Sequence, residues 1–179
     1  MKILLLSSAT SIHTIQWAKY LIQQGLDIHI VSQHPKAVDF PESIPVTLLP
    51  YKGFLGYFLN VFALRKILKE IQPDILNVHY ASGYGTLARL SGFHPCVLSV
   101  WGSDVYDFPY ESKLKMRIIQ KNLEYSDVIC STSNVMKIQT EKLLRTPKNI
   151  YVTPFGIDTS VFTPKNHYSE KVKIIGTVK

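Results

Sequence analysis

The sequence predicts an α/β fold, in which a parallel sheet carries helices on both faces. Two observations support this prediction: the expected strands are short, β-branched and apolar along almost their whole length, and helical patterns separate them. Strands of this kind are typical of sheets buried on both faces. The chain has 179 residues, of which 46% are hydrophobic and 18% charged. This length and composition suit one Rossmann-like domain with a sizeable core and a short tail.

The first part of the chain alternates strands with helical patterns. The first expected helix carries apolar residues at helical spacing, and Gly25 ends it. Three prolines interrupt the stretch after the second strand, which therefore forms a loop. The expected elements are strand 2–7, helix 13–24, strand 27–32, loop 33–45, strand 46–49 and helix 54–71.

The second part continues the alternation, beginning after Pro73, which ends the long helix. The expected elements are strand 74–78, helix 83–91, strand 96–100, loop 101–110, helix 112–125, strand 127–131, helix 134–145, strand 150–153 and strand 171–178.

Helix 54–71 carries two apolar stripes. The first stripe should face the sheet and consists of Phe54, Tyr57, Val61, Leu64, Leu68 and Ile71. The second stripe consists of Leu55, Leu59 and Phe62, and continues into Lys66 and Lys69. Such a stripe suits a membrane surface, but it suits contact with a neighbouring helix or domain equally well, and the pattern favours packing.

Polar residues gather in the loops that follow the strands. In open parallel sheets, ligands bind outside the carboxyl ends of the strands, so these loops hold the candidate site. The candidates for a phosphate-binding loop are Ser8, Thr10, Ser11 and His13. The other candidates for ligand contact are His79, Tyr80, Tyr84, Trp101, Gly102, Ser103 and Asp104, with Gly156 and Asp158 after the strand at 150–153.

Each candidate also has an ordinary structural explanation. Thr10 or Ser11 could simply cap the first helix, and His13 could be a surface residue whose charged form the helix dipole disfavours. His79 could be a buried partner for a main-chain carbonyl. Trp101 offers an apolar face to a sugar ring and Asp104 an acceptor for sugar hydroxyls, whereas the alternative is a tight turn with Ser103 or Asp104 capping a short helix.

Several function classes are unlikely on sequence grounds. The chain has no Gly-x-Gly-x-x-Gly fingerprint and no Walker A motif, which argues against a dehydrogenase or P-loop enzyme. The six His residues lack metal-site spacing, and Cys96 and Cys130 fall in strands as expected for thiols in a reducing compartment. The net charge of +7 indicates anionic partners, but the basic residues are spread along the chain and no nucleic-acid recognition motif is present.

Several segments, taken in order, resemble one family. They are residues 2–8, 13–25, 73–85, 99–105, 125–129 and 152–158, with Phe162 and Pro164. Together they resemble the amino-terminal domain of retaining glycosyltransferases of family 4, the group 1 proteins with a GT-B fold, in a subgroup with Trp-Gly-Ser-Asp. The resemblance departs from the family at Trp101, where many members have a histidine, and at Ser8–Thr10, where a Gly-Gly pair is usual.

The resemblance implies two Rossmann-like domains facing each other, of which this chain is the front, acceptor-binding one. Residues 1–164 would form this domain, and residues 165–179 the linker and first strand of a donor-binding domain that the chain lacks. The full protein would transfer a sugar from a nucleotide-sugar donor to a glycan, lipid or other acceptor, with retention and without a metal or other cofactor. The fragment alone would be inactive, and no catalytic residue carries over.

One alternative remains open: a stand-alone acceptor-binding or membrane-docking subunit, paired with a separate donor domain. Its membrane contact would run through helix 54–71. In either case the sequence predicts a cytoplasmic protein, peripheral on the inner face of the membrane where that helix binds lipid, since no segment has about 18 consecutive apolar residues.

Overall fold

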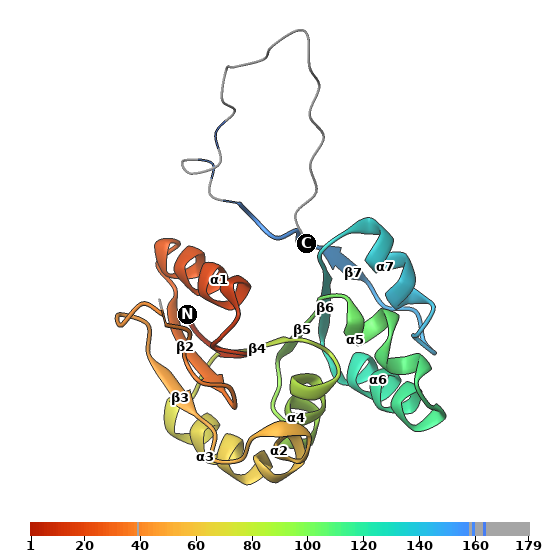
Figure 1. Ribbon diagram of the computed structural model, residues 1–179, viewed down its shortest axis with the longest axis horizontal. Coiled ribbons are helices and arrows are strands. Elements are labelled where there is room, and N and C mark those ends of the chain that lie inside the picture. Colours follow the sequence, from red (N-terminus) through yellow and green to blue (C-terminus); the bar gives the residue numbers. More distant parts are fainter. Residues whose placement is uncertain (39, 158, 160–162, 164–179) are drawn as a thin grey trace, which may run out of the picture.

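The computed structural model describes residues 1–38, 40–157, 159 and 163. Its centre is a parallel sheet with the strand order β3-β2-β1-β4-β5-β6-β7 (Figure 1). This sheet confirms the predicted fold class. The strands are β1 (Lys2–Leu6), β2 (Asp27–Ser32), β3 (Val46–Leu48), β4 (Ile75–His79), β5 (Cys96–Val100), β6 (Val128–Ser131) and β7 (Ile150–Val152).

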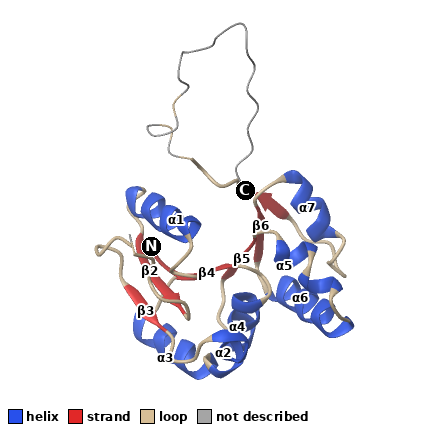
Figure 2. Ribbon diagram, viewed as in Figure 1, coloured by secondary structure: helices blue, strands red, loops and turns tan. Residues whose placement is uncertain are grey.

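Helices cover both faces of the sheet, but unequally (Figure 2). Helix α1 lies on one face, and the other helices of the described chain lie on the opposite face or beside the β6–β7 edge. The helices are α1 (Ile12–Gln23), α2 (Gly53–Leu59), α3 (Val61–Ile71), α4 (Gly83–Ser91), α5 (Ser103–Tyr106), α6 (Lys113–Tyr125) and α7 (Asn134–Glu141), with a 3-10 turn η1 (Phe108–Tyr110).

Strand β1 shows how the two-sided core forms. It pairs in parallel with both β2 and β4, so both of its edges are hydrogen-bonded. Its side chains alternate between two clusters: Leu4 and Leu6 pack with α3 and α4, whereas Ile3 and Leu5 pack against α1. All four are buried, which explains why the strand reads as a continuous apolar run.

The single helix predicted over 54–71 is wrong, because Asn60 divides it into α2 and α3. The Asn60 side chain is fully buried and bonds the main chain of Tyr51 twice, accepting from its N–H and donating to its carbonyl. With ψ near 0°, Asn60 ends α2 and begins α3. Asparagine readily makes such local side-chain bonds to the main chain, which compete with a continuous helix.

The two apolar stripes of this segment differ in how far they are buried. Leu64 and Leu68 are buried beneath α3, as predicted, but Phe54 is 60% exposed, so the prediction that it faces the sheet is wrong. The second stripe does not pack within the described part of the chain. Leu55, Leu59 and Phe62 are exposed by 66%, 52% and 80%. With Phe54 and Phe58 they form what we call the α2–α3 apolar surface.

Two further segments differ from the prediction. The loop expected over 101–110 contains α5 and η1, and the helix expected over 134–145 ends at Glu141. Gly25 ends α1 as predicted, with a φ of 78° that suits glycine. The predicted strand 171–178 and the predicted domain boundary after 164 lie outside the described residues.

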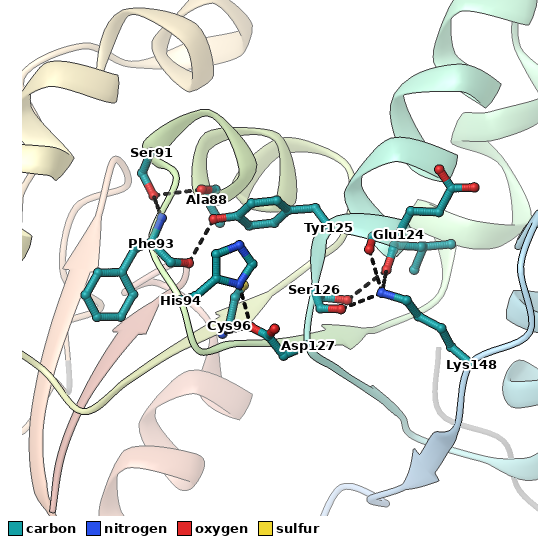
Figure 3. Close-up of polar contacts among 11 residues, drawn as sticks. Ala88, Ser91, Phe93, His94, Cys96, Glu124, Tyr125, Ser126, Asp127 and Lys148 are labelled. Atoms are coloured by element: carbon teal, nitrogen blue, oxygen red, sulfur yellow. Dashed lines mark hydrogen bonds and ion pairs between the residues drawn. The ribbon is translucent and has the colours of Figure 1, made fainter.

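The amino edge of the sheet, where β5, β6 and β7 begin, is held by paired polar groups (Figure 3). The Asp127 carboxylate accepts a hydrogen bond from the Cys96 N–H and pairs with His94, each at 2.6 Å. The Lys148 ammonium donates to the carbonyls of Leu123, Glu124 and Ser126, at the end of α6. These bonds fix the starts of neighbouring strands against one helix.

No helix within the described residues is both long and apolar enough to cross a membrane.

Candidate functional site

Five aromatic side chains meet at the opposite edge of the sheet, where the strands end. We call this edge, with the loops 7–13, 79–85, 101–108 and 154–157, the carboxyl rim. His79 ends β4 and lies between Trp17 of α1 and Trp101 after β5, with ring centres 5.8 and 4.8 Å away. His13 stacks on Phe155 at 3.9 Å and 9°, and Trp101 contacts both rings edge-on. The structure therefore brings together His13, His79 and Trp101, all candidates from the sequence.

His79 is the most buried member of this aromatic cluster. Its side chain is fully buried, and neither ring nitrogen has a hydrogen-bond partner among the described residues. Burial, with a smaller contribution from the neighbouring His13, lowers the pKa of His79 to about 3. The ring is therefore neutral at physiological pH, as expected for an imidazole removed from water. The carbonyl-partner explanation considered for His79 is not what the structure shows.

Two other polar atoms in the cluster are also buried without a partner among the described residues. They are the Nδ1 atom of His13 and the indole N–H of Trp101. Burial also lowers the pKa of His13. Each unpaired buried polar group costs about 1–3 kcal/mol, and folded proteins pair most of them. Four such atoms lie in this one cluster, although buried polar atoms are usually hydrogen-bonded. Exceptions of this kind concentrate at functional sites.

Tyr80 and Ser103 join the loops after β4 and β5 on the exposed side of the rim. Their hydroxyl groups are 2.5 Å apart. Tyr80 has a φ of 79°, which lies in the left-handed region that side chains other than glycine rarely adopt. A non-glycine residue held there is strained, and such strain is common at functional sites.

Asp104 links the loops after β4 and β5 on the buried side of the rim. Its carboxylate is fully buried and accepts hydrogen bonds from the N–H groups of Ala81, Trp101 and Gly102, at 2.7–3.3 Å. Burial raises the pKa of Asp104, and these three donors oppose the rise. Gly102 has a φ of 143° and is itself the N-cap of α5, without a capping bond from a side chain. The motif is therefore a tight turn, as considered from the sequence, but neither Ser103 nor Asp104 caps the helix. Asp104 instead holds the main chain at Trp101 and at Ala81, the residue after Tyr80.

Tyr84 also lies beneath the rim. Its side chain is 2% exposed, and its hydroxyl contacts Nδ1 of His34 at 2.7 Å, the Gln33 N–H at 3.1 Å and the Ser32 hydroxyl at 3.3 Å. Burial raises the pKa of Tyr84 well above its ordinary value. Tyr84 thus anchors α4 to the loop after β2, and its described contacts are all with protein groups.

The first loop places three hydroxyl groups before the start of α1. Ser8 and Thr10 pair with each other at 2.7 Å, and Ser11 occupies the N-cap position without a capping bond from its side chain. The capping explanation for Ser11 therefore does not account for its hydroxyl. The unpaired N–H groups of the first turn of α1 face the rim beside these hydroxyls, which is an arrangement suited to an anion.

A cavity of about 480 Å³ lies between α1 and residues 154–157. Gly156 lines it, together with His13, Trp17 and Phe155 from the aromatic cluster and Lys19 from the outer side of α1. It combines aromatic faces with polar side chains, which is typical of small-molecule sites. The other candidate of this segment, Asp158, lies outside the described residues.

Three residues at the rim were not among the sequence candidates: Trp17, Phe155 and His34. Trp17 is one helical turn after His13, so helical spacing alone places both on one face of α1. Phe155 follows β7 directly, and His34 follows β2, so both belong to loops at the carboxyl ends of strands. Their positions were therefore available from the sequence, whereas their contact with residues from other strands was not.

The other chemical groups of the chain are consistent with this arrangement. Within the described ranges, His, Cys, Asp and Glu side chains form no group of three that could hold a metal ion. Cys96 and Cys130 are both free thiols in neighbouring strands. Burial raises the pKa of both thiols, that of Cys96 to about 12. Neither thiol is part of the rim.

Comparison with known families gives one match over most of the chain. A family model described as glycosyl transferase 4-like matches residues 2–133. One curated relative is a Bacillus subtilis (strain 168) protein named as a teichuronic acid biosynthesis glycosyltransferase, TuaC. It is 26% identical over 108 residues, which cover 59% of this chain and 27% of that protein.

Solved structures share the fold at low sequence identity. A sucrose-phosphate synthase from Thermosynechococcus elongatus superposes with a TM-score of 0.74 at 13% identity, and HepE of Anabaena with UDP and glucose with 0.70 at 16%. A glycosyltransferase from Rickettsia africae ESF-5 reaches 0.63 at 21%. The matches cover 92%, 93% and 95% of this chain but 50%, 47% and 47% of those chains. The chain thus spans about half the length of these structures.

Proposed function

Because the chain belongs to the glycosyl transferase 4-like family, we propose that it is the acceptor-side domain of an enzyme that moves a sugar from a nucleotide-sugar donor to a glycan or lipid-linked acceptor. The aromatic cluster at the carboxyl rim is the observation that carries this proposal. Aromatic faces pack well against sugar rings, and the same place holds four buried polar atoms that have no partner among the described residues. HepE, a neighbour in fold, has been solved with UDP and glucose, which supports a nucleotide-sugar donor here.

Each part of the rim has a role in this proposal. Ser8, Thr10, Ser11 and the first turn of α1 lie where a donor phosphate would gain from hydroxyls, N–H groups and the helix dipole. Trp101 presents a ring to the sugar, and Tyr80 and Ser103 present hydroxyls to the acceptor. His79 supports Trp101 from below as a neutral ring. Asp104 and Tyr84 position these loops, and Gly156 lines the adjoining cavity.

The donor itself would be held mainly by a second Rossmann-like domain facing this rim. The similar solved structures are about twice as long as this chain, which supports a partner domain of that size. The departing diphosphate would be stabilised by main-chain donors and positive charge, without a metal or other cofactor. Retention at the anomeric carbon follows from the resemblance of the sequence motifs and is part of the proposal. The name of the Bacillus relative favours bacterial polysaccharide synthesis as the setting.

The test is a transfer assay on the full-length protein with a panel of nucleotide sugars, in which released nucleoside diphosphate is measured and the product anomer is read by NMR. We expect Trp101→Ala to lower kcat/KM by about a hundredfold, because a misplaced sugar reacts poorly. Leu114→Ala changes an exposed apolar residue on α6, outside the rim loops, and should leave the rate unchanged. Release from no donor, or an unaffected Trp101→Ala variant, contradicts the proposal.

A second proposal concerns the location of the acceptor: the α2–α3 apolar surface contacts the inner face of an anionic membrane. The surface carries five exposed apolar side chains. Residues 43–69 contain Lys52, Arg65, Lys66 and Lys69 but no acidic residue. Glu70 follows this range and pairs with Lys66 at 3.8 Å, and Arg65 donates to the carbonyls of Leu90 and Ser91. An apolar face beside basic residues is the pattern that binds anionic lipid. A stand-alone docking subunit, working with a separate donor domain, would use the same surface.

Vesicle sedimentation tests this contact. The protein should sediment with vesicles of phosphatidylglycerol and phosphatidylcholine but not with phosphatidylcholine alone. Changing Lys66 and Lys69 together to Glu should abolish sedimentation, because each basic residue near the surface contributes about 1 kcal/mol. Lys142→Glu alters an exposed lysine after α7 and serves as the matched control. Equal sedimentation of all three proteins removes the membrane contact.

A further inference from the structure

A small apolar notch lies between α2 and the start of α4. Its volume is about 60 Å³. Three α2 side chains form one wall, and residues from η1 and α6 form the other. The lining side chains used below are Phe54, Tyr57, Phe58, Phe108 and Ile118, with Gly83 at the base. The notch is separate from the cavity beside α1, because the two lie on opposite faces of the sheet.

The base of the notch depends on Gly83. A Cβ atom at this position would lie 2.3 Å from the ring of Tyr57, so only glycine lets that ring close against α4. Phe54 and Phe58 contact each other edge-on at 5.6 Å on the outer side. The walls are therefore built from packed aromatic rings and are formed in advance of any ligand.

The Thr86 hydroxyl and the Ser82 carbonyl at the notch are already paired within the protein. The Thr86 hydroxyl donates to the Ser82 carbonyl at 2.5 Å and accepts from the Asn122 amide at 2.9 Å. Asn122 also donates to the carbonyls of Ala81 and Ser82. A polar ligand would find few unpaired groups here, whereas a hydrocarbon would bury apolar surface without displacing a hydrogen bond.

The residues that line the notch belong to two neighbouring parts of the fold. Its outer side chains, Phe54 and Phe58, are 60% and 40% exposed and belong to the α2–α3 apolar surface. Its inner end is formed by Ser82 and Gly83, which follow Tyr80 of the carboxyl rim by two and three residues. A chain lying in the notch would thus start at the apolar surface and bring an attached polar head group to the rim.

We propose that this notch binds the hydrocarbon next to the head group of a lipid-linked acceptor. The cavity holds about two groups of the size of a methyl, since a water-sized group occupies about 30 Å³. The notch therefore holds a short, branched part of the hydrocarbon, while the rest of the lipid lies against the α2–α3 apolar surface. The positive charge of residues 43–69 complements the phosphate of such a lipid. The acceptor role of the lipid rests on the proposed transferase function.

Farnesyl monophosphate is a suitable probe, because its branched chain is short enough to study below its micelle concentration. Methyl NMR of isoleucine-labelled protein should show that farnesyl phosphate and farnesol both shift the Ile118 resonance. Inorganic phosphate should leave it unchanged. Shifts caused equally by inorganic phosphate, or an unmoved Ile118 signal at saturation, would overturn the proposal.

Two variants then fill the notch from different walls: Ile118→Trp and Phe58→Trp. Each should weaken farnesyl phosphate binding at least tenfold in calorimetry, and circular dichroism with thermal unfolding shows which variants are folded. Leu59→Ser is the matched control, because Leu59 is exposed on the apolar surface but does not line the notch. It should reduce vesicle sedimentation while farnesyl phosphate binding stays unchanged. Unchanged binding by a folded notch-filling variant contradicts the proposal.

These measurements separate the notch from the proposals on which it builds. If the wild-type protein binds farnesyl phosphate but does not sediment with anionic vesicles, the membrane contact is removed and the notch remains. Sugar transfer to a water-soluble acceptor that Ile118→Trp does not change, together with lost transfer to a farnesyl-linked acceptor, would assign the notch to acceptor choice. Equal transfer to both acceptors by Ile118→Trp would exclude a role of the notch in acceptor choice.

Discussion

At the amino edge of the sheet, the Lys148 ammonium has three carbonyl partners, and Asp127 accepts from both Cys96 and His94 (Figure 3). At the carboxyl rim of the same sheet, His79 buries two ring nitrogens with no partner among the described residues. Both edges join the same strands. The amino edge uses its polar groups to hold the fold, whereas the rim leaves polar groups unpaired at a cost to stability.

This contrast gives the two edges opposite expected responses to substitution. Removing a polar group at the amino edge should destabilise the protein, because its partners are left unpaired. Removing an unpaired polar group at the rim should stabilise it. Asp104 is the informative exception, because it lies at the rim but is fully paired. The free energies of unfolding of matched variants, measured by chemical denaturation, therefore test this contrast.

The largest effect is expected for Asp104→Ala. The substitution leaves the N–H groups of Ala81, Trp101 and Gly102 without their acceptor in a buried place, and should lower the free energy of unfolding by about 3 kcal/mol. Asp107→Ala, at an exposed acid nearby, should have little effect. If urea denaturation gives the two variants equal stability, Asp104 does not hold the loops together.

Lys148→Met should cost about 2 kcal/mol, since three carbonyls at the end of α6 lose a charged donor. Methionine keeps much of the apolar stem, so the loss reports the hydrogen bonds rather than packing. Lys142→Met is the control at an exposed lysine. A stability loss no greater than that of the control would show that the amino edge does not depend on these bonds.

The next prediction concerns the pH dependence of stability. Because the pKa of His79 is about 3 in the folded chain and 6.5 ordinarily, the unfolded chain takes up a proton at a pH where the folded chain does not. Its contribution to stability is therefore complete above pH 6.5 and falls as the pH drops toward 3. Between pH 7 and pH 5 the loss should be about 2 kcal/mol, at 1.36 kcal/mol per pH unit.

His79→Leu is the variant that isolates this contribution. The difference in unfolding free energy between pH 7 and pH 5 should be smaller in the variant than in the wild type by that amount. The other histidines remain in both proteins, so they cancel in the difference. An unchanged pH dependence would mean that His79 can be protonated in the folded protein.

The smallest expected effect is at pH 7, where His79→Leu should raise the free energy of unfolding by about 1 kcal/mol. The substitution removes two buried, unpaired nitrogens and leaves an apolar side chain of similar size. The same variant should lose sugar transfer if the ring supports Trp101. A destabilised variant would show that the stabilisation from the aromatic contacts with Trp17 and Trp101 exceeds the cost of the unpaired nitrogens. The proposed contrast between the two edges would then not hold at His79.

The sequence predicted the main elements because their signals are local. Strands such as Lys2–Leu6 read as apolar runs, and Gly25 ended the first helix as expected. The break at Asn60 was missed because it depends on a bond to Tyr51, nine residues earlier, which helical periodicity does not show. The exposure of Leu55, Leu59 and Phe62 was also undecided, because a second apolar stripe looks the same whether or not something covers it.

The candidate site, like the fold, could be predicted from the sequence only in part. Loop positions after the strands already placed His13, His79 and Trp101 at one edge of the sheet. The burial of Asp104 and Tyr84 beneath that edge could not be foreseen, because their partners are main-chain groups of other loops. Trp17 joins the site by its contact with His79, and Phe155 by its contacts with His13 and Trp101, all from other segments of the chain. Contacts between distant segments decide which polar residues face a ligand and which hold the loops.

By itself, the sequence determined the α/β class, the order of the strands along the chain, the family resemblance and the edge at which the functional loops gather. These follow from local periodicity and from the rule that parallel strands end on one side. Only the tertiary structure decided which side chains are paired, buried or left exposed. Pairing and burial depend on groups brought together from far along the chain, and no local pattern records them.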